Sequence, residues 1–230
     1  MSGIATQAGM LRGGAGSDNA LATDLVEWWE DADTTGKVSS GTLNLVNSNV
    51  NTGIVVETGG PNGLDWWNTS ALNSAFQAKT NLSSAISGDF AAIACLKVRG
   101  YTYSATLSPK TSDGQNIGWR YVPFNGANKQ ELRTSTGFVN GTSDLATFND
   151  WSAIAVSYDY ASSTSTFHLF NSSDSVLISK SHTDTGGTIL PFIFRQNADI
   201  AICAYYNRQL SAADVEAFYN SGTFYKYSDL

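Results

Sequence analysis

The end of the chain constrains its fold more than any other segment does. Residues 200–206 (Ile-Ala-Ile-Cys-Ala-Tyr-Tyr) form an apolar run of strand length, and a short polar corner follows them. Ser211 is a favourable N-cap residue with Asp214 three positions later, as in a capping box, and Gly222 is a natural helix terminator. The apolar residues between them share one helix face: Val215, Phe218 and Tyr219. This pattern predicts a buried strand, a sharp corner and one short helix.

The rest of the chain has the pattern of short strands separated by turns. Residues 91–98 are almost continuously apolar, which is typical of a strand covered on both faces. Residues 59–63 (Gly-Gly-Pro-Asn-Gly) form a clear break. About a dozen such strands with turn signals between them favour a sandwich or jelly roll. A length of 230 residues suits a single domain of this class.

Several stretches resemble the LamG-like domains of the concanavalin A-like lectin/glucanase superfamily. The most specific one is similar to a strand and corner of the type D-I-A-E-V-x-I-Y-N-R-x-L-S, with Ile202 where that pattern has an acid. The resemblance implies an all-β, two-sheet antiparallel jelly-roll sandwich with one short C-terminal helix. The matching stretches occur in the family's order: residues 25–29, 88–98, 151–159 and 199–211.

The first residues differ in composition from the remainder. Residues 1–20 are Gly-rich and have few apolar side chains, so they cannot fold alone. We expect them to form a flexible N-terminal arm, either a disordered terminus or a segment that orders against a partner. The resemblance implies that residues 21–230 form a LamG-like domain. The chain begins without a basic start and apolar run, so no secretory signal is expected, and no stretch has the ~20 apolar residues of a membrane helix.

Charge and cysteine usage exclude several classes of protein. The net charge of −7 and the absence of any Lys/Arg cluster exclude nucleic acid as a partner. Cys95 and Cys203 both fall in apolar runs, which favours buried free thiols over a disulfide. His168 and His182 do not have the spacing of zinc ligands.

The sequence contains no recognisable catalytic constellation. Glycosidases need two carboxylates at a fixed separation. In the glucanase branch of the lectin/glucanase superfamily, these carboxylates occur in the pattern E-x-D-x-x-E. The nearest approach, residues 27–33 (Glu-Trp-Trp-Glu-Asp-Ala-Asp), has a different spacing. No nucleophile elbow or phosphate loop is present. We therefore expect no enzymatic activity, and a glucan hydrolase is the least favoured alternative.

Calcium is the one ion that the sequence makes worth considering. Residues 31–36 alternate oxygen-bearing side chains before a glycine, but an EF-type loop would need Glu at the position of Thr42. We expect a solvated turn and no cofactor. The alternative calcium site would require three distant carboxylates to come together in the fold: Asp65, Asp159 and Asp199.

Glycan binding requires exposed aromatic rings beside hydrogen-bonding side chains. The candidates are Trp66, Trp67, Tyr101, Tyr103, Trp119, Arg120 and Tyr121. The alternative for each aromatic residue is the core, where large rings usually lie. Trp66 and Trp67 are the expected exceptions, because neighbours in a strand point to opposite faces and cannot share one core.

The resemblance leads to a functional hypothesis that composition alone would not give. We expect a non-enzymatic structural or adhesion protein of a phage particle, such as a capsid decoration, fibre or tail component. The arm would attach it to other virion proteins, and the sandwich would bind surface glycans weakly. Synthesis in the host cytoplasm followed by incorporation into the virion fits the lack of a signal. A carbohydrate-binding module or host-recognition adhesin is the alternative function, and self-association into a homo-oligomer is compatible with either function.

Overall fold

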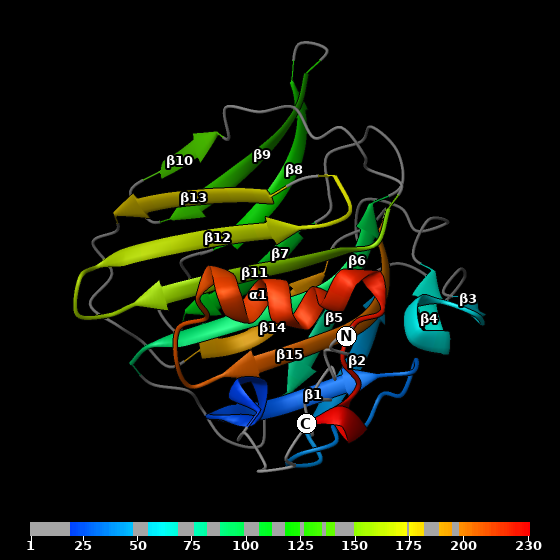
Figure 1. Ribbon diagram of the computed structural model, residues 1–230. Coiled ribbons are helices and arrows are strands. Elements are labelled where there is room, and N and C mark those ends of the chain that lie inside the picture. Colours follow the sequence, from blue (N-terminus) through cyan, green and yellow to red (C-terminus); the bar gives the residue numbers. More distant parts are fainter. Residues whose placement is uncertain are drawn as a thin grey trace, which may run out of the picture.

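The described residues of the chain form two antiparallel sheets and one short α-helix (Figure 1). The computed structural model describes residues 19–47, 55–68, 76–81, 88–98, 106–111, 118–124, 127–134, 137–140, 150–173, 175–181, 189–194 and 198–230. Within these residues, all strand pairs are antiparallel. This confirms the predicted class, a two-sheet antiparallel sandwich with one short helix.

The larger sheet has eight strands in the order β13-β12-β11-β6-β15-β4-β3, and β1 also pairs with β15. β4 pairs with the first part of β15 and β1 with the second part, so both occupy the same edge of that strand. The strands of this sheet are β1 (Leu25–Glu30), β3 (Val55–Glu57), β4 (Trp66–Asn68), β6 (Phe90–Val98), β11 (Ser152–Asp159), β12 (Thr164–Phe170), β13 (Ser175–Ser181) and β15 (Ala198–Tyr206).

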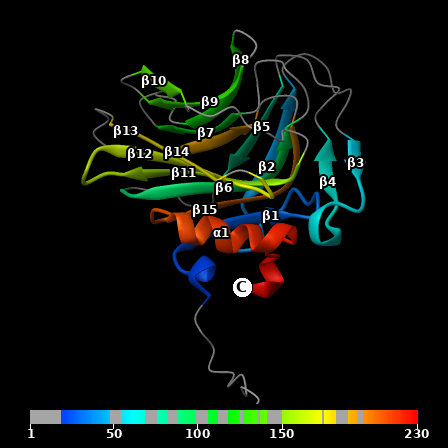
Figure 2. The same cartoon turned by 45° about the horizontal axis from the view of Figure 1, so that its top comes forward.

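The smaller sheet has seven strands in the order β10-β9-β8-β7-β14-β5-β2. Figure 2 shows it stacked on one face of the eight-stranded sheet, while the helix covers the other face. Its strands are β2 (Thr42–Asn47), β5 (Phe76–Asn81), β7 (Thr106–Thr111), β8 (Gly118–Phe124), β9 (Ala127–Thr134), β10 (Gly137–Asn140) and β14 (Ile189–Phe194). The molecule therefore has three layers: sheet, sheet and helix.

The central strand β6 is buried on both faces, as its continuous apolar run predicts. Ala91, Ile93 and Cys95 belong to a cluster beneath the helix, which we call the α1-side core. Phe90 and the alternate residues after it face the other sheet, where the Phe90 ring stacks on Tyr158 at 5.2 Å between centroids. The eight-stranded sheet thus separates two hydrophobic cores.

A register shift between Ile200 and Ile202 in β15 changes which residues face the helix. Ala201 and Ile202 are adjacent, yet both belong to the α1-side core, as a bulge allows. Ile202 is fully buried there, at the position where the resembling family has an acid. Cys203 pairs with Ala94 and Cys95 with Ile202. Both cysteines are buried and free, which confirms the sequence prediction.

The helix α1 (Ala212–Tyr219) begins where the sequence predicts and ends earlier. The Ser211 hydroxyl accepts a hydrogen bond from the Asp214 N–H at 3.2 Å, and the Asp214 carboxylate accepts one from the Ser211 N–H at 2.7 Å. This confirms the capping box. The C-cap is Asn220, in the left-handed region with φ 46°, whereas Gly222 lies in the turn that follows (Asn220–Gly222).

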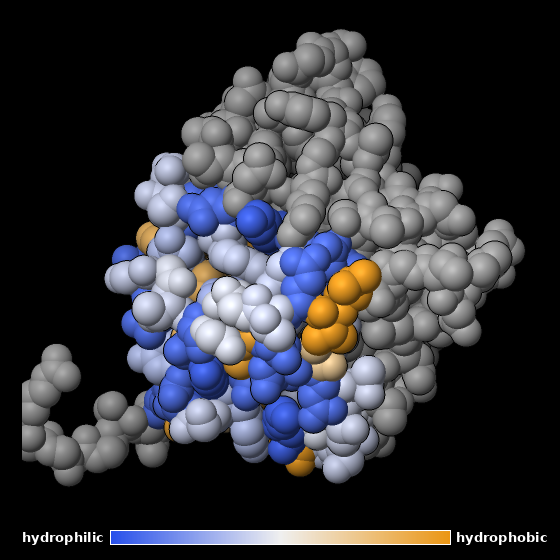
Figure 3. Space-filling model, turned by 90° about the vertical axis from the view of Figure 1, so that its right-hand side faces the viewer, coloured by the Kyte–Doolittle hydropathy of each residue, from blue (hydrophilic) through white to orange (hydrophobic). Residues whose placement is uncertain are grey.

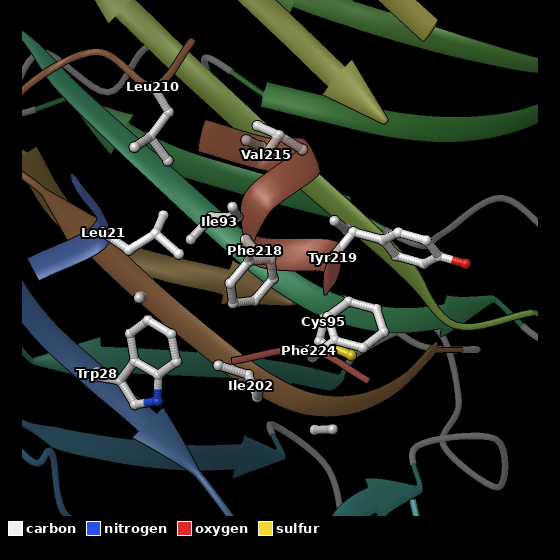
Figure 4. Packing of buried hydrophobic residues seen from close by; sticks show 14 of the residues in the cluster. Leu21, Trp28, Ile93, Cys95, Ile202, Leu210, Val215, Phe218, Tyr219 and Phe224 are labelled. Atoms are coloured by element: carbon white, nitrogen blue, oxygen red, sulfur yellow. The ribbon is translucent and has the colours of Figure 1, made fainter. Parts of the chain in front are cut away.

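The apolar face of α1 packs on the eight-stranded sheet together with both ends of the described chain (Figure 4). Trp28 of β1 meets Phe218 edge-to-face, with 5.8 Å between ring centroids. Leu21, in the short 3-10 helix Ala20–Ala22, is 1% exposed in the same core. Two further 3-10 turns are Pro61–Gly63 and Tyr227–Asp229.

Strand β3 lies at one edge of the eight-stranded sheet and carries an exposed apolar pair. Val55 and Val56 are 51% and 53% exposed, and Figure 3 shows a small apolar patch on the side of the molecule where β3 lies. The strand has only three residues, so little backbone is open to pairing. In the part of the chain that the structure describes, no helix is long and apolar enough to cross a membrane.

Candidate functional site

Trp66 and Trp67 do not form an exposed sugar platform. They are 7% and 2% exposed, so the expectation that they lie outside the core is wrong. Trp66 belongs to the α1-side core and contacts Trp151 edge-to-face, with 5.7 Å between ring centroids. Trp67 follows it in β4 and points to the opposite face. Because both faces of the eight-stranded sheet are covered, the two tryptophans are buried in different hydrophobic cores, one on each side of the sheet.

The other predicted glycan-binding residues lie in the seven-stranded sheet or outside the description. Tyr101 and Tyr103 are outside the described residues. β8 carries the remaining three: Trp119, Arg120 and Tyr121. In the register of β8 with β9, Trp119 is opposite Leu132, which is fully buried. Arg120 is opposite Glu131 and Tyr121 is opposite Gln130.

Glu27, the first carboxylate of the acidic segment, is bound inside the protein. It is fully buried, and its oxygens accept hydrogen bonds from the Val38 N–H, the Gly41 N–H and the Ser39 hydroxyl, each at 2.7 Å. Burial alone would raise the pKa of Glu27, but these hydrogen bonds outweigh it and hold the pKa below its usual value. A Cβ on Gly36 would come within 2.2 Å of the Glu27 carboxyl carbon. Glu27 therefore organises the loop after β1.

The carboxylates considered for calcium are separated or already bonded. The Asp33 carboxylate lies 3.0 Å from the Lys37 ammonium. Asp159 ends β11 beside the start of β6, whereas Asp199 pairs with Lys97 near the other end of β6. Among residues with described positions, no group of three or more His, Cys, Asp or Glu side chains could hold a metal ion.

A surface pocket of about 410 Å³ lies beside the C-terminal half of α1. Its volume falls within the range of ~300–1,000 Å³ that is usual for small-molecule sites. We call it the α1 pocket. It is lined by Phe170, Ala213, Glu216, Ala217, Tyr219, Asn220, Ser221 and Tyr225.

The floor of the α1 pocket is the outer stripe of the helix. Ala213, Glu216, Ala217 and Asn220 recur at helical spacing, opposite the stripe that packs on the sheet. The two alanines leave space above the helix, while Glu216 and Asn220 are exposed polar groups. Phe170, at the end of β12, forms a wall with Tyr219, with 5.6 Å between ring centroids.

The second wall is the chain that folds back after α1. Asn220 and Phe224 have left-handed backbone conformations, with φ of 46° and 56°. The Phe224 N–H donates to the Tyr219 carbonyl at 3.2 Å, and the Tyr225 N–H donates to the Phe218 carbonyl at 3.3 Å. The Phe224 ring lies 5.3 Å from Tyr219, edge-to-face. These contacts place the half-buried Tyr225 beside the pocket.

The α1 pocket combines aromatic rings with hydrogen-bonding groups. Burial, and secondly the negative charge of Asp150, raise the pKa of Tyr219, so its phenol is neutral and can donate a hydrogen bond. In Figure 4 its hydroxyl points away from the α1-side core. Glu216 adds a carboxylate, Asn220 an amide and Ser221 a hydroxyl. A few polar groups on an apolar lining are typical of sites that orient a small ligand.

No residue of the α1 pocket was among the predicted site residues. The sequence predicts the buried face of α1 but gives no reason to assign function to the opposite face. One signal does exist: small and polar residues at i, i+3, i+4 and i+7 from Ala213, followed by an aromatic residue after the helix. Phe170, which supplies one wall of the pocket, is distant in sequence from the helix. Only the structure shows that it lies beside the helix.

Comparison of the sequence with protein-family models and with curated proteins gives no match. Comparison of the structure with solved protein structures does give matches. Trypanosoma rangeli sialidase is similar with a TM-score of 0.53 and 12% identity, over 86% of this chain and 33% of the sialidase chain. Domain 4 of AbnA, a GH43 extracellular arabinanase from Geobacillus stearothermophilus solved with arabinotriose, has a TM-score of 0.51 and 15% identity, over 84% of this chain and 97% of that domain.

Similarity at these identities shows the fold alone. The chain spans about a third of the length of the sialidase it matches. The finding overturns the prediction that the chain is not an enzyme, because this fold occurs within a sialidase and as one domain of an arabinanase, and the fold does not exclude catalysis. The chain has a two-sheet antiparallel β-sandwich fold, which it shares with AbnA domain 4.

Proposed function

We propose that this chain is a glycan-binding β-sandwich domain and that the α1 pocket is its sugar site. The observation that carries the proposal is the lining of the pocket, in which Tyr219, Tyr225 and Phe170 stand beside exposed hydrogen-bonding groups. The shared fold with AbnA domain 4, which was solved with arabinotriose, supports it.

The lining suggests how a sugar would bind. An aromatic ring offers an apolar face to the C–H groups of a sugar ring. The hydroxyl groups of the sugar would exchange hydrogen bonds with Glu216, Asn220 and Ser221. A shallow site for one or two sugar units supports only weak binding, with a Kd on the order of 0.1–1 mM.

Calorimetric titration of a neutral and acidic oligosaccharide panel, with arabinotriose as the first neutral probe, tests the proposal. Tyr225→Ala should weaken binding of any glycan that the natural chain binds by about tenfold, since it removes one aromatic wall. Tyr160→Ala is the matched control, because Tyr160 is 47% exposed and lies in the turn between β11 and β12, outside the pocket lining. Equal losses in both variants, or binding that survives Tyr225→Ala, would contradict the assignment.

The same panel addresses catalysis. Reducing ends released from bound oligosaccharides over hours would indicate hydrolysis, and their release should then fall in Tyr225→Ala together with binding. Turnover that is unaffected by this variant would place the reaction elsewhere in the molecule.

The finer proposal is that the domain is part of a virus particle, attached through residues 1–20 to other virion proteins. Their Gly-rich composition and the LamG-like resemblance support it. The Asn19 side chain donates to the Asp229 carbonyl at 3.3 Å, and Arg208 donates to the Ala20 carbonyl at 2.7 Å. A deletion should therefore end at residue 17 and spare the fold.

Deletion of residues 1–17 should leave the unfolding temperature unchanged and abolish incorporation into particles. Incorporation would be measured by co-sedimentation with purified virions. A truncated chain that still co-sediments would exclude the arm as the attachment device.

A further inference from the structure

The described lining of the α1 pocket carries an acidic side chain and no basic one. Glu216 is the only ionisable acid or base of Asp, Glu, Lys, Arg or His type among the residues that line it. Glu216 is exposed, so little protein separates its acidic side chain from a ligand in the pocket. The last turn of α1 contains no basic residue to offset it.

Two further features make the pocket more negative. Asp150 lies close enough to Tyr219 for its charge to act on the phenol, and its carboxylate accepts hydrogen bonds from the Ser172 hydroxyl at 2.5 Å and the Trp151 N–H at 2.9 Å. Most of the helix residues in the lining also belong to the C-terminal half of α1, where the helix dipole carries partial negative charge.

The nearby cations do not compensate. Arg208 lies at the other end of α1, where its guanidinium is 3.1 Å from the Asp214 carboxylate and also donates to the Ala20 carbonyl. Lys226 follows Tyr225 in sequence and, like Asp150, lies outside the pocket lining. Within the described lining, a carboxylate on a ligand would meet the Glu216 side chain and no basic one, which costs affinity.

We infer that the α1 pocket selects non-acidic sugars: it accepts neutral or amine-bearing glycans and rejects sialosides and uronides. This inference rests on the proposed function and goes beyond it, because it names the ligand class. Selectivity follows from the placement of Glu216, Asp150 and the end of α1, since a site discriminates by what it repels as well as by what it attracts.

Calorimetric titration with three probes of similar size tests the inference: arabinotriose, a glucosamine trimer and a galacturonic acid trimer. At low salt the acidic trimer should bind at least about tenfold more weakly than the neutral or amino trimer. Raising the salt concentration to about 0.5 M should narrow this difference, because screening reduces the repulsion.

Glu216→Gln should raise the ratio of acidic to neutral affinity about three- to tenfold, the effect of removing one unit charge at about 6 Å in a solvated site with an effective dielectric constant of about 40–80. Asp24→Asn is the matched control. Asp24 is exposed, carries the same charge and precedes β1, at the end of α1 where Arg208 donates to the Thr23 carbonyl. Its substitution should leave the ratio unchanged.

The outcomes separate the two claims. Failure of every probe to bind would overturn the proposed function, and the ligand class with it. Binding that tolerates the acidic trimer as well as the neutral one, or a ratio that Glu216→Gln does not move, would overturn the ligand class alone.

Discussion

At the scale of single residues, Glu27 shows how the fold uses a buried charge. Its carboxylate is separated from solvent, yet backbone N–H groups and the Ser39 hydroxyl replace the water that it loses. Gly36 is required beside it, because any Cβ would occupy the position of the carboxylate. Glu27, which belongs to the acidic segment that most nearly resembles a glycosidase motif, thus holds a loop in place.

Glu27→Gln tests this role. The amide keeps the size of the side chain but presents N–H groups to donors that need an acceptor, so the free energy of unfolding should fall by about 1.5–3 kcal/mol. Urea unfolding followed by tryptophan fluorescence measures it, with Asp24→Asn as the exposed control. A loss below about 0.5 kcal/mol would show that the loop does not depend on the charge.

At the scale of elements, the two ends of α1 differ in how far the sequence predicts them. The start is encoded locally, because Ser211 and Asp214 bond to each other's backbone N–H groups. The end depends on tertiary packing: the helix ends at Tyr219 because Asn220 turns left-handed and Phe224 packs back on the helix. The α1 pocket is formed by this reversal, so its position could not be predicted from local signals.

The same distinction explains the tryptophan pair of β4. Alternation predicts that Trp66 and Trp67 face opposite sides, and they do. It does not say whether both sides are covered, which depends on where the helix and the chain termini pack. The long apolar runs of β6 and β15 do predict double coverage. The sequence therefore predicts the sandwich as a whole. Whether the side chains of a three-residue strand such as β4 are buried depends on how the rest of the sandwich packs around it.

At the scale of the whole molecule, pH acts on stability through several buried groups. Burial lowers the pKa of His168, more than the nearby Asp214 charge raises it. The unfolded chain then takes up a proton at higher pH than the folded one, so stability falls as pH drops below about 6.5. Glu27 and Asp214 have lowered pKa values, so their contributions are lost only at more acidic pH, below about 4.5.

We expect two separate losses of stability on acidification. Unfolding temperatures measured between pH 8 and pH 3 should reveal both steps. His168→Gln should reduce the step that begins near pH 6.5 and leave the more acidic step in place. An upper step of the same size in the variant would show that His168 does not cause it.

The most direct test of the central claim, that the α1 pocket binds glycan, is a map of amide chemical-shift changes during titration with a neutral oligosaccharide. Arabinotriose is the first probe. The largest changes should fall on Glu216, Ala217, Asn220 and Tyr225, and they should disappear in Tyr225→Ala while Tyr160→Ala keeps them. Changes confined to β8 and β9, with the pocket amides unmoved, would contradict the claim.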